Sequence, residues 1–90
     1  MGVGGWGQII GQQCVLAWIV ENVADWPHVS YYLAIRRYDA SGSLLFPITT
    51  IDTPKLSFVK GSGDVMTMKD AKGQTVTFNL KTLKLTTHRG

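Results

Sequence analysis

The most hydrophobic part of the chain is an uninterrupted apolar run over residues 14–20. A β-strand would divide the run between two apolar faces: Cys14, Leu16, Trp18 and Val20 on one, Val15, Ala17 and Ile19 on the other. The wider segment 8–26 could instead form a helix that ends before Pro27, but its many β-branched residues favour a strand. In either form, other parts of the protein or a partner must pack against both faces of the segment.

Alternating apolar and polar positions in the rest of the chain predict short strands joined by turns. Asp39 and Asp70 favour turns because their side chains can accept hydrogen bonds from the backbone that follows. The alternation breaks after Leu80, which predicts a bulge or a short 3₁₀ turn at 81–82. We expect a hairpin over 30–46, a loop at 49–54, and strands at 55–60, 65–69, 74–80 and 83–87.

Five or six short strands with frequent turns predict an all-β protein. We expect a single domain over residues 1–90, built as a small antiparallel barrel of the SH3-like or OB-like kind, or as a small sandwich. The glycine-rich segment 1–7 is expected to be flexible.

Charge is distributed unevenly along the chain, although the net charge is only +3. From residue 55 onward there are seven basic residues and two aspartates, whereas the first 54 residues carry a net charge of −2 and all three tryptophans. The start of the chain lacks the basic residues of a secretory signal, and the apolar run is too short to cross a membrane as a helix. We therefore expect a cytoplasmic protein without a membrane span.

The sequence contains no recognisable catalytic or metal-binding motif. His28 and His88 are far apart, the single cysteine, Cys14, lies in an apolar run, and Ser30 is not part of a nucleophile elbow. We therefore expect a non-catalytic protein without cofactor or metal, and we infer no small-molecule substrate.

Two kinds of macromolecular partner fit the remaining features. The surplus of apolar residues near the N-terminus predicts a protein interface, in a homo-oligomer or a larger assembly. The residues proposed for it are Trp6, Ile9, Ile10, Trp18 and Trp26. The alternative is a single-stranded RNA- or DNA-binding protein that combines cations with stacking rings. The residues proposed for that contact are Tyr31, Arg36, Arg37, Tyr38, Lys69, Lys72, Lys81 and Lys84.

Overall fold

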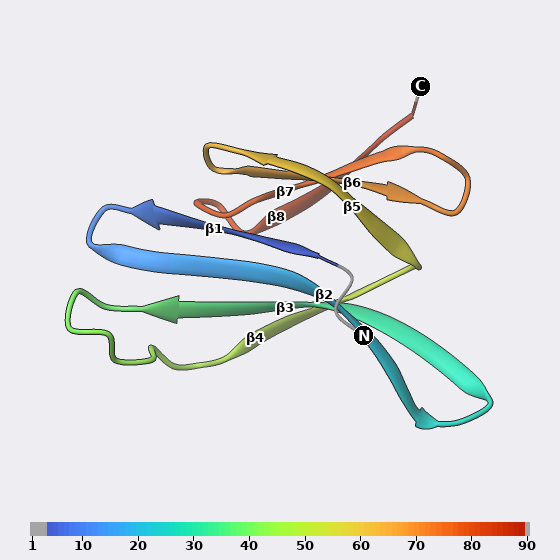
Figure 1. The fold of residues 1–90 in the computed structure, drawn as a ribbon, viewed down its shortest axis with the longest axis horizontal. Helices are drawn as coiled ribbons and strands as arrows, with labels where there is room; N and C mark the ends of the chain where they lie inside the picture. The colour runs from blue at the N-terminus through green and yellow to red at the C-terminus, as the bar shows by residue number, and fades with distance from the viewer. Residues whose placement is uncertain (1–3, 90) are drawn as a thin grey trace.

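The chain forms two antiparallel four-stranded sheets in a computed structural model that describes residues 4–89 (Figure 1). In each sheet every strand pairs with the next one along the chain. Sheet A contains β1 (Gly5–Ile10), β2 (Gln13–Asp25), β3 (His28–Tyr38) and β4 (Thr49–Thr53). Sheet B contains β5 (Leu56–Ser62), β6 (Val65–Asp70), β7 (Thr75–Asn79) and β8 (Lys84–His88).

The expected all-β class is confirmed, with more strands than the five or six that the sequence indicated. No strand pairing joins the two sheets into a closed barrel within residues 4–89. Because these residues form only strands, turns and loops, they contain no helix that could span a membrane.

The segment 8–26 is extended, as its β-branched residues favoured, but it is not one element. A turn at Gly11 and Gln12 divides it between β1 and β2, which pair from Gly5 opposite Trp18 to Ile10 opposite Gln13. Of the segment 1–7 that was expected to be flexible, residues 5–7 begin β1. Residues 1–3 lie outside the described range.

The hairpin expected over 30–46 is also corrected. Residues 44–46 make only one isolated bridge, between Leu44 and Tyr38, and Pro47 follows them with no N–H to donate to a ladder. The partner of β3 is instead β4, at 49–53, in the segment expected to be a loop. The polar residues Thr50 and Asp52 concealed this strand, because they lie on the face opposite the inward-facing Ile51.

Asp39 and Asp70 hold their turns in the expected way. The Asp39 carboxylate accepts hydrogen bonds from the N–H groups of Ser41 and Ser43, at 2.9 and 3.0 Å, and Asp70 accepts the equivalent pair in the β6–β7 turn. The Ser41 hydroxyl also donates to Asp39. This hydroxyl and the Ser43 N–H hold the pKa of the Asp39 carboxyl below its usual value.

The break in alternation after Leu80 is resolved by a turn between β7 and β8. The Asn79 side-chain oxygen accepts hydrogen bonds from the N–H groups of Lys81 and Thr82, at 2.8 and 3.0 Å. Leu83 then adopts a positive φ of 59°, and its N–H donates to the Asn79 carbonyl. After this turn the side chain of Leu85 points inward and packs against the core.

The two sheets share one hydrophobic core. Sheet A contributes Val15, Ala17, Ile19, Leu33 and Ile35, and sheet B contributes Leu56, Met66, Met68, Val76, Phe78 and Leu80. Trp6 joins the layers at one side of this core, because its indole N–H donates to the Gly63 carbonyl at 2.8 Å. A Cβ built on Gly61 would overlap the Trp6 ring, so the ring rests directly on the backbone of β5.

This close contact predicts that Gly61→Ala destabilises the protein by about 1–3 kcal/mol, through overpacking against Trp6. Ser62→Ala, at the exposed neighbouring position of the same strand, is the matched control and should change stability by no more than about 0.5 kcal/mol. Chemical denaturation measures both. Equal stability of Gly61→Ala and the wild type would show that the Trp6 ring does not rest on Gly61.

Candidate functional site

The outward-facing sides of the two sheets differ in chemistry. On β2, residues 15, 17 and 19 are buried in the core, and the residues between them point away from it. The strand register pairs these outward-pointing residues of β2 with residues of the neighbouring strands, and the pairs form four rows across sheet A. These rows, the outer face of sheet A, are Gly5–Trp18–Ala34–Thr50, Gly7–Leu16–Arg36, Ile9–Cys14–Tyr38 and Val20–Tyr32–Asp52.

The side chains of Trp18 and Leu16 lie against two glycines of β1. A Cβ on Gly5 would lie 2.6 Å from the Cβ of Trp18, and a Cβ on Gly7 would overlap the side chain of Leu16. Shallow hollows follow this glycine row, lined mainly by apolar atoms of β1 and β2. Side chains from another molecule could enter these hollows beside Leu16 and Trp18.

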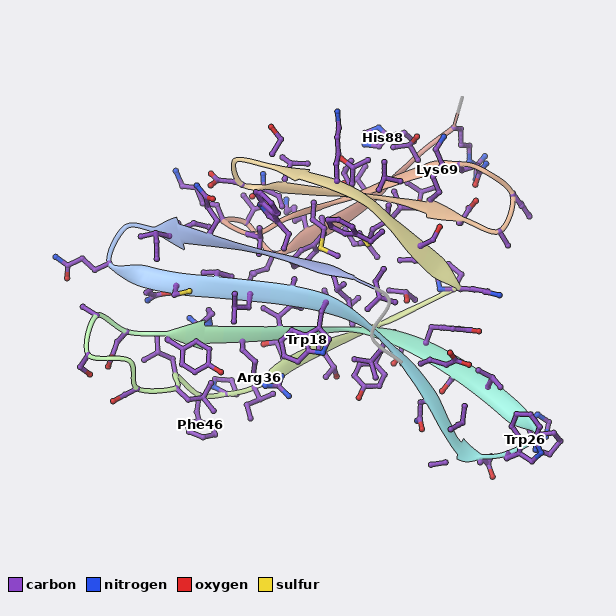
Figure 2. The ribbon with its side chains drawn as sticks, viewed as in Figure 1. Trp18, Trp26, Arg36, Phe46, Lys69 and His88 are labelled. Carbon is purple, nitrogen blue, oxygen red and sulfur yellow. The ribbon has the colours of Figure 1, made fainter. Side chains whose placement is uncertain are left out.

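Trp18 is the largest apolar group of the outer face and lies half-buried near its centre. The Arg36 guanidinium stands 5.3 Å from the centroid of its ring, at cation–π distance. Phe46, which is 72% exposed, lies in the loop between β3 and β4 (Figure 2). A tryptophan ring with an arginine stacked on it is the kind of anchor that protein interfaces favour.

The β2–β3 hairpin projects beyond the strands that flank it (Figure 1). The pairing of β1 ends at Trp18 and that of β4 ends at Tyr31, and residues 21–30, the projecting hairpin, are all exposed. Trp26, at the tip (Figure 2), is 75% exposed, and Val23 and Val29 of the same hairpin are also exposed. The hairpin therefore carries apolar side chains away from the core.

The structure divides the residues proposed for a protein interface among three places. Ile9 and Trp18 lie on the outer face of sheet A, with Ile9 66% exposed. Trp26 lies on the projecting hairpin, whereas Trp6 and Ile10 face inward and pack against the core.

Sequence reasoning missed the rest of this outer face, most of all Leu16, Tyr32 and the glycines of β1. The useful signal was the alternation in Gly5-Trp6-Gly7, which places one ring inward and leaves the opposite side without side chains.

The residues proposed for nucleic-acid contact do not form one surface. Arg36 and Tyr38 lie on the outer face of sheet A, whereas Tyr31 and Arg37 point to the other face of β3. The lysines belong to sheet B: Lys69 and Lys84 lie on its outward strand positions, and Lys72 and Lys81 lie in its turns. The proposed contacts are thus divided between the two faces of sheet A and the strands and turns of sheet B.

The outer face of sheet B is polar. Its three rows of paired residues are Lys60–Thr67–Thr77–Thr86, Ser57–Lys69–Thr75–His88 and Ser62–Val65–Asn79–Lys84. Figure 2 shows Lys69 and His88 on the side of the molecule opposite Arg36 and Phe46.

Within the part of the chain that the structure describes, no three His, Cys, Asp or Glu side chains are grouped in a way that could hold a metal ion. The thiol of Cys14 is half-buried on the outer face of sheet A. Comparison with protein-family models, curated proteins and solved structures finds no match to this chain.

The position of Trp18 predicts its contribution to stability. Phe78→Ala, at a fully buried position, should cost about 3–5 kcal/mol. Trp18→Ala should cost only about 1–2 kcal/mol, because solvent already reaches part of the ring. Chemical denaturation of both variants measures the difference. Equal losses for the two variants would place Trp18 in the core and remove it from the candidate site.

Proposed function

We propose that the protein is a non-catalytic protein-interaction module that binds through the outer face of sheet A. The partner is a second copy of the chain, alone or within a larger assembly. One observation carries the proposal: sheet A is apolar on both faces, whereas sheet B has one apolar face and one polar face. Sheet B packs against one face of sheet A, and among residues 4–89 the other face leaves Leu16, Trp18 and Val20 partly exposed.

The types of side chain on the outer face of sheet A favour a role in binding a protein partner. Apolar patches larger than a few hundred Å² are uncommon on monomers and mark interaction sites. Tryptophan, tyrosine and arginine are the side chains that most often dominate binding energy at protein interfaces. Trp18, Tyr32, Arg36 and Tyr38 supply all three types within adjacent rows of two strands.

The size of the face indicates that the projecting hairpin takes part as well. Four strands about 4.8 Å apart, with four rows about 6.7 Å apart, give a flat area of roughly 400 Å². A stable interface buries about 800 Å² on each partner. Trp26, which is 75% exposed at the tip of the projecting hairpin, would add to the contact area.

A second copy suits such a face because two identical apolar sheets can pack against each other across a two-fold axis. Sheets that pack face to face are separated by about 10 Å, which leaves room for one layer of side chains from each. The shallow hollows along β1 and β2 offer space for side chains from the partner.

Self-association is tested by light scattering after size exclusion, over a series of protein concentrations. The wild type should have a mass greater than that of its 9.9 kDa chain. Leu16→Lys places a charge in the middle of the outer face and should yield a folded monomer, because burying an unpaired charge in the interface is costly.

The matched control is Thr77→Lys, which places the same charge at the centre of the outer face of sheet B. It should assemble as the wild type does. A wild type that remains monomeric at high concentration would rule out self-association, and equal dissociation of both lysine variants would show that this face is not the interface.

A further inference from the structure

The outer face of sheet B combines cations with hydroxyl groups. Its central row runs Lys60–Thr67–Thr77–Thr86 across all four strands, and Lys69 and Lys84 occupy the rows on either side. The three lysines are exposed. The register places no acidic residue and no Phe, Tyr or Trp ring in these rows. The face therefore offers positive charge and hydrogen-bond donors, without a platform for stacking.

We propose that this face binds the phosphate backbone of a nucleic-acid duplex. Lysine and threonine are among the side chains that contact phosphate oxygens. Proteins that hold single strands stack the bases on aromatic rings, and this face has none. A duplex keeps its bases stacked inside and presents a phosphate charge about every 1.7 Å along its axis. Such a ligand matches a face of cations and hydroxyls alone.

One end of the face offers an anchoring point for a phosphate. A shallow hollow there is lined by Lys69, Lys72, Thr75 and His88, together with parts of the β6–β7 turn. The Lys69 ammonium donates to the Gly73 carbonyl at 3.2 Å, and the His88 ring is hydrogen-bonded to the Thr77 hydroxyl at 2.9 Å. These contacts hold two strands and a turn around a space where a phosphate would meet several donors.

The shape of the face indicates which part of a duplex it contacts. Four strands about 4.8 Å apart are at least about 14 Å wide, whereas the major groove of B-DNA is about 12 Å wide. The sheet would therefore lie across the backbone and would not enter a groove. Binding of this kind is independent of base sequence and depends on salt, because bound lysines release counterions from the phosphates.

Fluorescence anisotropy with a labelled duplex of roughly two helical turns, at several salt concentrations, tests the proposal. With Lys60, Lys69 and Lys84 in contact, the logarithm of the association constant should fall against the logarithm of salt with a slope of about −3. The double variant Lys69→Gln/Lys84→Gln should bind more weakly at low salt and flatten the slope by about 2.

The control is Arg37→Gln, which removes a positive charge from sheet A on the face opposite Arg36 and should leave the slope unchanged. A flattening by Arg37→Gln as large, per charge removed, as that by the double lysine variant would overturn the proposal, as would tighter binding of the corresponding single strand. Binding of a sulfated polysaccharide without binding of the duplex would also overturn it. These outcomes concern only sheet B, so they do not bear on self-association through sheet A.

Discussion

The contact of Trp6 with the backbone of β5 fixes how the two sheets lie together. Trp6 belongs to sheet A through the pairing of β1 with β2, yet its ring rests on Gly61 and its N–H reaches the Gly63 carbonyl. Sheet B is thereby held over one face of sheet A, and the core between them is sealed at the β1–β5 side. A chain that builds only two layers can cover sheet A once.

The remaining surface follows from that constraint. The apolar run that supplies the core from residues 15, 17 and 19 supplies an equally apolar set on its other side, around Leu16 and Trp18. Sheet B has no such second set, because threonines and lysines alternate with its core residues. The chain thus carries an apolar outer face on sheet A and a basic outer face on sheet B, and Figure 2 shows Arg36 of the first and Lys69 of the second on opposite sides of the molecule.

Much of the fold was predictable from the sequence, because alternation decides which residues face inward. It correctly predicted strands in the segments 65–69 and 74–80, which supply Met66, Met68, Val76, Phe78 and Leu80 to the core, and the turn signals at Asp39 and Asp70 were correct. Strand β4 was missed because only Ile51 among its residues carries an apolar inward side chain. The division of 8–26 at Gly11 was missed because both sides of that turn are apolar.

The candidate site was predicted less well than the fold, because sequence patterns do not show how many layers will cover a strand. Trp6, Ile10 and Trp18 are equally apolar in sequence, but the first two pack against the core and the third lies on the open face. The same limit applies to the proposed nucleic-acid contacts. Arg36 and Lys69 are both charged residues at strand positions. Only the strand pairing shows that they belong to different sheets and lie on opposite sides of the molecule.

Cys14 provides the most direct test of the central claim, that sheet A carries an apolar face which a second copy covers. It is the only cysteine in the chain and lies on the outer face between Ile9 and Tyr38. The rate at which a maleimide reagent modifies its thiol is measured in dilute and in concentrated protein. The account predicts a much slower reaction in concentrated protein, because self-association would cover the thiol. An equal rate at both concentrations would contradict it.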